Sequence, residues 1–592
     1  MRKERFWRLF AIEFGTTGRR DLNFRKLLDW RKVLIYSHRW LGIGLGVMFV
    51  VWSISGIVLM YAGLPRLTAA ERLWRMEALD LGRLAVSPME AAKAAGLIGK
   101  KTPARLRVDM MDGRPVYRLN SGQTWATVWG DTGEALKPLD AGAARARLAR
   151  FLGIDAAKLR YDAYLAGPDL FTVDSPFRPH LPLHKFALDD AAGTKYYVSE
   201  KTGEIVMRTD RMTRFLGFSG YVIHRLTFMK TYFWWRPFWT TFVWCGLAMC
   251  LSGVVVGIWR FSPSARFRQK RVASHTPYAS WMKWHHYAGL IFGVTMFTWM
   301  ISGSMMAEAV PGIAAPFFGG GKLTKAQAEA VSGGPVTLKG ITAENVRGAA
   351  AAVAGKFVPK ELEYLQFGGK GYFVAYEAPR SESEAASRVS TSIGDFAAPG
   401  LDEPHVMVAV GNPEAGLFDK FPDEAMMATA RAVMPGVKVA EATWLREYDD
   451  YYYQVIPTFN EAALKAVRPL PVLRVRFADA QETRLYLAPT HGQVARYAAE
   501  DRFKRWGYFG LHSLDFAVLL NRRPVWDIVV FLLLAGGAVL SATTLLPMWR
   551  RLERHGRRLV GRVTGKKAGV SVRPVMAPEA AMMRREREGY GD

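Results

Sequence analysis

The stretch His38-Arg-Trp-Leu-Gly-Ile-Gly-Leu-Gly46 recurs 247 residues later as His285-His-Tyr-Ala-Gly-Leu-Ile-Phe-Gly293. Each copy opens a long apolar run, and both runs carry Trp-x-Ile-Ser-Gly in register, at residues 52–56 and 299–303. A histidine at the mouth of a membrane helix is costly to keep, so each is a candidate functional residue. Two such histidines at matching places predict a duplicated chain that holds a metal cofactor between its copies.

Four apolar runs are long enough to cross a bilayer, which takes about 20 residues. They cover residues 40–64, 238–259, 289–310 and 525–548. No small-residue cleavage site follows the first run, so we expect a retained anchor and not a removed signal peptide. The two cysteines, Cys245 and Cys250, lie in the second run and point about 140° apart on a helix, so they should not pair.

The net charge of +27 is unevenly distributed. Residues 1–32 hold 10 Lys and Arg against 4 acids, residues 260–284 hold 6 against none, and the tail after residue 549 holds 12 against 5. In a four-span chain these segments lie on one side, and the positive-inside rule places them in the cytoplasm. No nucleic-acid-binding motif accompanies the charge, so topology and contact with anionic lipid explain it.

The repeat extends beyond the first span of each half. Arg236-Pro-x-Trp239 before the second span matches Arg523-Pro-x-Trp526 before the fourth. Each half is therefore one span, an outward region, a short segment before the membrane and a second span. The predicted parts are a basic N-terminus (1–32), first span (33–64), outward region (65–210), interfacial helix (211–237), second span (238–259), cytoplasmic loop (260–284), third span (285–310), outward region (311–498), interfacial helix (499–524), fourth span (525–548) and basic tail (549–592).

The outward regions carry the patterns of small α+β modules. Ser87-Pro-Met-Glu90 predicts a capped start for an Ala-rich helix. Strands are predicted at residues 104–108 and 114–120, around a Met-Asp-Gly turn, and at residues 195–199. Residues 381–414, polar and dotted with Gly and Pro, predict a loop. The fold class we expect is a helical membrane protein with two extracytoplasmic α+β domains.

The ordered set of motifs resembles the PepSY-associated transmembrane family, in which PepSY-like modules sit between membrane helices. The residues that carry the resemblance are His38-Arg-Trp-x-Gly42, Ser55-Gly56, Ser302-Gly303, Ile223-His-Arg-Leu226, Leu511-His-Ser-Leu514 and Tyr197-Val-x-x-x-Thr-Gly-Glu204. The family includes iron-regulated membrane proteins and haem-containing ferric-siderophore reductases. The resemblance therefore implies b-type haem and electron transfer across a membrane.

The residues themselves support haem ligation at the cytoplasmic ends of the spans. Two axial histidines make a six-coordinate electron-transfer centre, so we expect His38 and His285 to share one haem. His286 is an alternative to His285, because it stands where the first copy has Arg39. Glycines four and eight residues after each histidine leave bare backbone for a porphyrin, although such spacing also suits helix packing. They are Gly42, Gly46, Gly289 and Gly293.

A second haem is expected on the outer side. His224 and His512 lie in aromatic, amphipathic segments that suit interfacial helices. A membrane thickness of about 30 Å separates them from the inner pair, so they should pair with each other. Candidate partners for haem propionates follow from charge. They are Arg225, Arg236 and Arg523.

Other polar residues carry weaker signals. Ser55 and Ser302 are expected to bond back to their own helix backbone, although either could touch a propionate. His180 and His184 lie in a Pro-rich segment without a third ligand, so a surface loop is expected. The remaining candidates are expected to be exposed polar residues, namely His275, His405, His491 and His555. No dinucleotide loop, nucleophile elbow or zinc-protease helix appears, so electrons would need a separate donor.

Two functions fit the sequence. The first is a multi-pass bacterial inner-membrane oxidoreductase with two haems b, cytoplasmic termini and periplasmic domains. It would pass electrons from a cytoplasmic donor to an acceptor such as a ferric chelate in iron uptake; no residue is assigned a catalytic role. The second is a non-enzymatic anchor that binds or regulates an extracytoplasmic partner such as a protease. A transporter built on repeats is disfavoured, because the spans lack buried charge and unwound segments.

Overall fold

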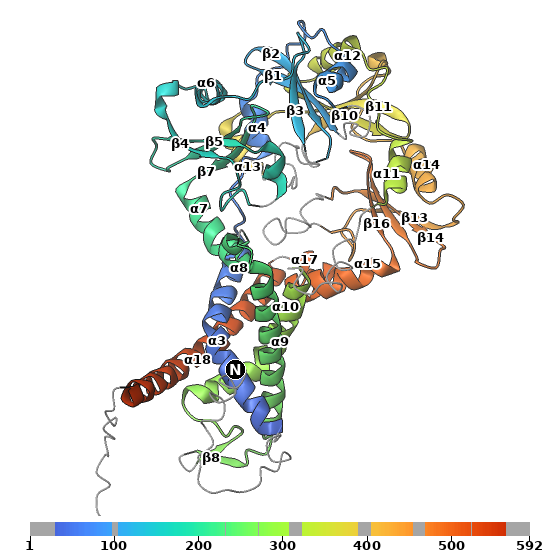
Figure 1. Ribbon diagram of the computed structural model, residues 1–592. Helices are drawn as coiled ribbons and strands as arrows, with labels where there is room; N and C mark the ends of the chain where they lie inside the picture. The colour runs from blue at the N-terminus through green and yellow to red at the C-terminus, as the bar shows by residue number, and fades with distance from the viewer. Residues whose placement is uncertain are drawn as a thin grey trace, which may run out of the picture.

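The computed structural model describes residues 30–97, 105–122, 124–173, 175–230, 232–269, 272–306, 323–388, 404–453, 468–522 and 524–563. Within them, four helices are long and apolar enough to cross a membrane (Figure 1). They are α3 (Trp30–Leu59), α9 (Trp235–Arg260), α10 (Trp281–Met306) and α18 (Val525–Val563). The four predicted spans are therefore confirmed as helices. The N-terminus before residue 30, the end of the third span at 307–310 and the tail after 563 lie outside the described residues.

The four helices pack as a ring, in which α3 and α10 each contact both α9 and α18. Aliphatic, aromatic and sulfur side chains fill its centre, and they include Leu45, Phe49, Met249, Met296 and Met300. The outward faces stay apolar, with Ile258 65% and Ile291 68% exposed. Soluble proteins rarely expose such large apolar faces to water, so these faces suit the hydrocarbon interior of a membrane.

Above the ring stands a strand-rich head, which we define as strands β1–β7 and β10–β16 with their helices (Figure 1). Its centre is a six-stranded antiparallel sheet in the order β12-β11-β10-β1-β2-β3. The strands are β1 (Arg105–Met111), β2 (Arg114–Asn120), β3 (Trp125–Trp129), β10 (Glu361–Phe367), β11 (Lys370–Tyr376) and β12 (His405–Ala409). Because β1 pairs with β10, with Val108 opposite Leu362, both outward regions contribute to one sheet.

Two four-stranded antiparallel sheets flank the central one, in the orders β4-β5-β6-β7 and β13-β14-β15-β16. The strands are β4 (Leu159–Leu165), β5 (Leu183–Leu188), β6 (Lys195–Ser199), β7 (Ile205–Thr209), β13 (Val439–Leu445), β14 (Val472–Phe477), β15 (Arg484–Ala488) and β16 (Gln493–Tyr497). Helices and short turns of the head are α4 (Ala69–Arg75), α5 (Pro88–Ala94), α6 (Ala141–Leu152), η2 (Ala156–Lys158), η3 (Ser175–His180), α11 (Lys325–Ser332), α12 (Ala343–Ala354), α13 (Glu382–Ser387), η7 (Pro413–Ala415) and α14 (Asp423–Val433).

Local sequence signals explain much of the head. Ser87 caps α5 with Glu90 in a reciprocal capping box, as predicted. The turn between β1 and β2 places Asp112 and Gly113 at positive φ, which a tight hairpin of this kind requires. The predicted loop 381–414 is wrong in part, because α13 and β12 fall inside it; residues 389–403 lie outside the described residues. A two-stranded ribbon of β8 (Phe267–Gln269) and β9 (Val272–Ser274) in the 260–284 loop was also not predicted.

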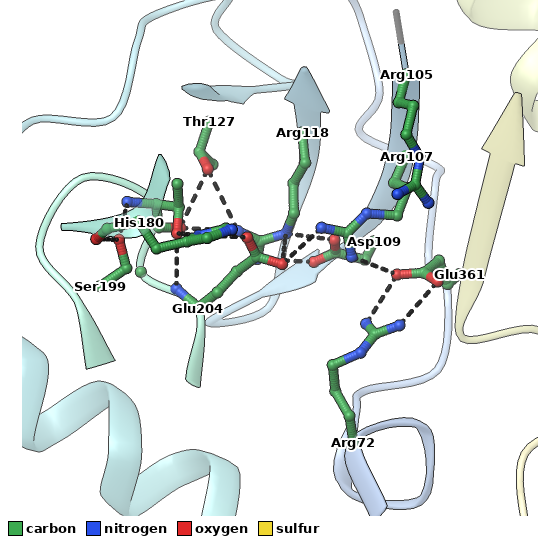
Figure 2. Close-up of polar contacts among 12 residues, drawn as sticks. Arg72, Arg105, Arg107, Asp109, Arg118, Thr127, His180, Ser199, Glu204 and Glu361 are labelled. Carbon is green, nitrogen blue, oxygen red and sulfur yellow. Dashed lines mark hydrogen bonds and ion pairs between the residues drawn. The ribbon is translucent and has the colours of Figure 1, made fainter. Parts of the chain in front are cut away.

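A buried cluster of opposite charges joins the parts of the head (Figure 2). Arg72 of α4 donates to both carboxylate oxygens of Glu361, at 2.8 and 3.0 Å. Arg107 of β1 donates to Glu361 at 3.0 Å and to Glu204 at 2.7 Å. These side chains are at most 6% exposed. The cluster therefore connects the helix after α3, the central sheet and the turn before β7.

Two short broken helices lead from the head into the membrane bundle. Before α9 the chain forms α7 (Arg211–Gly217), a π-helical turn η4 (Phe218–Val222), α8 (Ile223–Arg225) and η5 (Thr227–Met229). Before α18 it forms α15 (Ala499–Lys504), a π-helical turn η8 (Arg505–Gly510), α16 (Leu511–Ser513) and α17 (Ala517–Leu520). A continuous interfacial helix was expected at both places, and the structure breaks each one at its histidine.

Candidate redox centre

His224 and His512 meet at the end of the bundle nearest the head. Their ring centres lie 6.5 Å apart, with the planes inclined by 71°. His224 is carried by α8 and His512 by α16. The structure therefore brings together the two histidines that the sequence placed in one outer pair.

The backbone around each of these histidines is unusual in the same way. A π-helical turn precedes each one, and such turns are frequent at functional sites. Two residues after each histidine a leucine adopts the left-handed conformation, with φ 49° at Leu226 and 52° at Leu514. This conformation costs a non-glycine residue free energy, so the surrounding structure must hold it. Nothing in the local sequence signals these two leucines.

Hydrogen bonds fix the orientation of the outer histidines. Ser302 Oγ donates to Thr298 O at 2.7 Å, and it lies 3.0 Å from His512 Nδ1. Ser55 Oγ donates to Trp52 O at 3.1 Å and lies 3.1 Å from His224 Nδ1. Each hydroxyl already donates its hydrogen to a backbone carbonyl, so each serine oxygen accepts a hydrogen bond from Nδ1–H. The lone pair of each imidazole is then on Nε2, the nitrogen left available for a metal.

His38 and His285 form a second pair toward the other end of the bundle. Their ring centres lie 6.1 Å apart, with the planes inclined by 35°. Nδ1 of His38 is 2.9 Å from Met249 O, and Nδ1 of His285 is 3.2 Å from Leu540 O. A carbonyl oxygen only accepts, so Nδ1 donates in both cases. The inner histidines therefore have the same tautomer as the outer ones.

His286, the alternative to His285, does not join this pair. Its ring is 5% exposed, Nδ1 lies 2.7 Å from Thr276 Oγ1 and Nε2 lies 2.8 Å from Gly257 O. Both ring nitrogens of His286 are thus hydrogen-bonded within the protein. Adjacent residues on a helix point about 100° apart, so only one of the two neighbours can point toward His38.

The predicted glycines pack between helices and do not border the histidines. A Cβ at Gly46 would meet Thr544, one at Gly293 would meet Val254, and the nearest atoms at Gly42 and Gly289 belong to Met249 and Leu540. Other glycines lie beside the histidines. A Cβ at Gly253 would lie 2.6 Å from Cε1 of His38. A Cβ at Gly56 would lie 3.5 Å from Cε1 of His224, and one at Gly303 would lie 3.4 Å from Cε1 of His512. The glycine of each Ser-Gly pair thus lies beside the histidine that the serine contacts.

A cavity of about 730 Å³ opens at the outer pair. This volume lies within the range of about 300–1,000 Å³ that is usual for cofactor sites. Its walls are mostly apolar, with Phe49, Trp52, Met296, Trp299 and Met300 on the bundle side. Its basic lining residues are Arg178, Arg225, Lys230 and Arg236. Two of the three predicted propionate partners are therefore at the cavity, and Arg523 lies outside the described residues.

Both pairs have the spacing that a metal between two imidazoles requires. Two metal–nitrogen bonds of about 2 Å and two ring radii of about 1.2 Å put the ring centres about 6.4 Å apart. The observed 6.1 and 6.5 Å agree with this value. The spacing of both pairs is therefore compatible with one metal ion held between two imidazoles, and at the outer pair a cavity of about 730 Å³ adjoins the histidines.

The histidines of the head differ from expectation. His180 and His184 are buried at 0% and 4% exposure, and not in a surface loop, because His180 belongs to the charge cluster and Nε2 of His184 bonds Leu139 O at 2.8 Å. His491 is also buried, and its ring lies 4.2 Å from that of His405. His275, in the 260–284 loop, is exposed as predicted, and its Nδ1 lies 2.9 Å from Ser262 O. Within the described residues, no group of three or more His, Cys, Asp or Glu is placed to hold a metal ion.

Asp515 adds a titratable group close to the outer pair. Its carboxyl is buried, and burial raises its pKa to about 7, while the nearby charge of Arg505 opposes the rise. Tyr508 is buried beside it and stacks on His512, with ring centres 5.1 Å apart. The sequence held no signal for this group beyond the aromatic character of the segment.

The arrangement was compared with known proteins. No match was found among curated proteins. The model of a family described as the PepSY-associated TM region matches residues 35–551, which is most of the chain. That range includes the head, α9, α10, most of α3 and α18, and both histidine pairs. The chain belongs to the PepSY-associated transmembrane family.

Proposed function

We propose that the protein is a membrane oxidoreductase that binds two haems b, one at His38 and His285 and one at His224 and His512. The observation that carries the proposal is the geometry of the two pairs. In each pair the two histidines come from different segments, and their ring centres lie 6.1 or 6.5 Å apart. Nδ1 of every ring is hydrogen-bonded within the protein. Neutral imidazoles presented in this way suit axial ligation of haem iron.

The chain would contribute position, shielding and electronic tuning. A haem supplies one-electron chemistry when it is bound. Hydrogen bonds from Nδ1 to Ser55 and Ser302, and to the carbonyls of Met249 and Leu540, orient the rings and raise their basicity. The aromatic and thioether walls of the cavity would lower the dielectric constant around a bound haem, and this would tune its redox potential.

The two sites stand at opposite ends of the bundle. His38 and Ser55 are 17 residues apart on α3, as are His285 and Ser302 on α10, and 17 residues rise about 25 Å. Ser55 and Ser302 touch the outer histidines, so this rise separates the pairs along the bundle. Two redox groups at that separation would carry electrons across most of a bilayer core of about 30 Å.

The direction of transfer follows from the proposed topology. The basic segments would lie in the bacterial cytoplasm and the head in the periplasm, by the positive-inside rule. Electrons would enter near His38 from a separate donor and leave near His224 to an acceptor. A ferric chelate suits this role, because reduction to the ferrous ion weakens binding by hard oxygen ligands and releases iron for uptake.

The proposed internal duplication has support beyond the sequence motifs. Both outer histidines follow a π-helical turn, precede a left-handed leucine and contact the serine of an Ile-Ser-Gly motif. A central sheet in which β1 and β10 are antiparallel neighbours is what two related units facing each other would form. These matches favour a pseudo-twofold arrangement of two haem-binding halves.

The experiment that tests the function is electron transfer across a closed membrane. The full chain is reconstituted with haem in vesicles that trap a reductant, and ferric citrate is added outside. We expect a reducible Soret band and reduction of the external iron. In His38→Ala the iron reduction should be lost and the Soret band should be weaker, because the outer haem remains. A colourless protein would contradict the proposal and favour the non-enzymatic anchor that binds an extracytoplasmic partner.

A further inference from the structure

The fourth membrane helix, α18, is longer than a membrane requires. Its 39 residues rise about 58 Å, whereas the hydrocarbon core of a bilayer is about 30 Å thick. Pro547 lies inside the helix, where it removes a backbone hydrogen bond and favours a change of direction. We call residues 549–563, the part of α18 that follows, the arm. The sequence predicted only a basic tail here, so the helical structure of the arm is an addition to that prediction.

The arm runs sideways at the inner end of the bundle. Helices α3 and α18 approach each other at Gly46 and Thr544. They also meet at Trp40 and His555, whose ring centres lie 5.6 Å apart. Between these two contacts α3 advances six residues, or about 9 Å, while α18 advances eleven, or about 16 Å. The axis of α18 is therefore inclined to that of α3, and its end leaves the bundle sideways (Figure 1).

One face of the arm is apolar. At 100° per residue, positions 549, 552, 559 and 560 fall within an arc of about 100°. They hold Trp549, Leu552, Leu559 and Val560, which are 44–65% exposed. We call these four residues the apolar stripe. A helix normally buries a stripe of this width against a protein core or a membrane.

The opposite side of the arm is basic. The arm contains six arginines and one glutamate. Arg550, Arg554 and Arg558 are exposed and lie on the side away from the apolar stripe. Arg557 and Glu553 form an ion pair at 2.5 Å, so only a small part of the charge is balanced within the arm. Arginines opposite an apolar stripe that contains tryptophan and leucine are typical of helices that lie in a membrane interface.

We propose that the arm lies in the membrane surface at the end of the bundle that holds His38 and binds anionic phospholipids. The apolar stripe enters the outer part of the lipid chains, and the arginines contact headgroup phosphates. Arginine keeps its charge and binds phosphate through paired hydrogen bonds. Basic residues directly after a span are attracted to anionic lipid, and the arm starts two residues after Pro547 at the end of such a span. This interaction does not require the proposed haems.

The test determines where the two faces of the arm lie, using the full chain in nanodiscs. Nitroxide labels are attached in Leu559→Cys and in Arg554→Cys, each combined with Cys245→Ala and Cys250→Ala. Electron paramagnetic resonance compares collisions with oxygen, which dissolves in lipid, and with a nickel chelate, which stays in water. With phosphatidylglycerol present, we expect the label at 559 to favour oxygen and the label at 554 to favour nickel. This difference should shrink in pure phosphatidylcholine.

Charge variants separate the role of the arginines from that of the apolar stripe. Arg550→Gln with Arg558→Gln lowers the charge of the arm by two. We expect the label at residue 559 to become more accessible to the nickel chelate in phosphatidylglycerol nanodiscs. Arg266→Gln with Arg268→Gln is the matched control, because these exposed arginines lie beside and on β8, at the same end of the bundle but outside the arm. The control should leave the label at residue 559 unchanged.

Three results would overturn the proposal. Equal access of the nickel chelate to both labels would place the whole arm in water. A difference between the labels that is the same in both lipid mixtures would show that anionic headgroups are not recognised. A label at residue 559 that is shielded from both reagents would assign the apolar stripe to a protein surface, in a second copy of the chain or in a partner.

Discussion

Ser302 Oγ lies 3.0 Å from Nδ1 of His512 and donates its own proton to Thr298 O, so the serine accepts from the imidazole. The same relationship holds between Ser55 and His224. A hydroxyl that would otherwise only satisfy its own helix thus selects the tautomer of a candidate metal ligand. The hydrogen bond from each serine to its own helix was predicted, with a propionate as the other possible partner. In the structure the second partner of each serine is a histidine.

Removing this acceptor should weaken the outer site. Ser302→Ala leaves Nδ1–H of His512 without its partner, and losses of this kind cost about 10- to 100-fold in metal affinity. We therefore expect the outer haem to bind about ten-fold more weakly, measured by transfer of haem to an apo-globin acceptor. Ser53→Ala is the matched control, because Ser53 donates to Phe49 O within its own helix, α3, and makes no hydrogen bond to a histidine. Equal haem loss in both variants would refute the role of Ser302.

Replacing His285 and replacing His286 should have different effects on haem content and stability. His285→Ala removes one imidazole of the inner pair, so we expect one haem per chain to remain. His286→Ala removes hydrogen bonds to Thr276 and Gly257 and leaves a buried hole, so we expect lower thermal stability with two haems retained. Haem content per chain and the melting temperature are both measured on the purified protein. A haem lost from His286→Ala and kept in His285→Ala would reverse the assignment.

Gly253 should tolerate no side chain. A Cβ there would lie 2.6 Å from Cε1 of His38, against rigid ring atoms, so Gly253→Val should displace the imidazole and remove the inner haem. Gly257→Ala, one turn further along α9, is the control, because its Cβ would be 3.7 Å from the nearest atom, a methyl group of Leu290. The α-band of the reduced spectrum reports each haem. An inner haem that persists in Gly253→Val would show that His38 does not need this space.

The head should lose stability in acid. Burial alone would raise the pKa values of Glu204 and Glu361, but the charges of Arg107 with Arg118, and of Arg72 with Arg107, hold both below the ordinary range of glutamate. A depressed pKa in the folded state stabilises it above the unfolded pKa of about 4.3, and this contribution is lost as the pH falls below that value. We expect amide exchange of β1 and β10 in the full chain, corrected for the intrinsic rate, to be constant above pH 5 and to rise below pH 4.3.

Replacement of Glu361 makes this prediction specific. Glu361→Gln leaves Arg72 uncompensated in a buried site, at a cost of about 3–5 kcal/mol, and it removes one titrating group. Protection of β10 should therefore be lower at pH 7, and its remaining pH dependence shallower. Glu482→Gln, at a 63% exposed surface pair, should keep the unchanged profile. A profile for Glu361→Gln that is as steep as that of the unchanged chain would show that the cluster does not couple to folding.

Periodicity and repeats predicted the parts of the fold that depend on local sequence. The apolar runs gave the four helices, because about 20 apolar residues have few other stable environments. The Ser87 cap and the turn at Asp112 and Gly113 were predictable for the same reason, since each depends on a few adjacent residues. The pairing of β1 with β10 was not, because an edge-to-edge contact between residues about 250 positions apart leaves no local pattern.

The sequence predicted which histidines pair in the candidate site. It did not predict which residues surround them. Symmetry within the sequence paired His38 with His285 and His224 with His512. The choice of Gly253 over Gly42 depends on how α9 faces α3, which helix periodicity alone does not determine. The buried state of His180 and His491 was missed because a Pro-rich or turn-like segment normally lies on the surface, and here sheet packing covers it.

The most direct test of the central claim is the number of haems per chain in purified protein, determined from the pyridine haemochrome spectrum and the protein concentration. The account predicts two in the unchanged chain, one in His285→Ala, one in His512→Ala and none in the double variant. A count of two that survives either substitution, or a protein that takes up no haem at all, would contradict the pairing of these histidines as haem ligands.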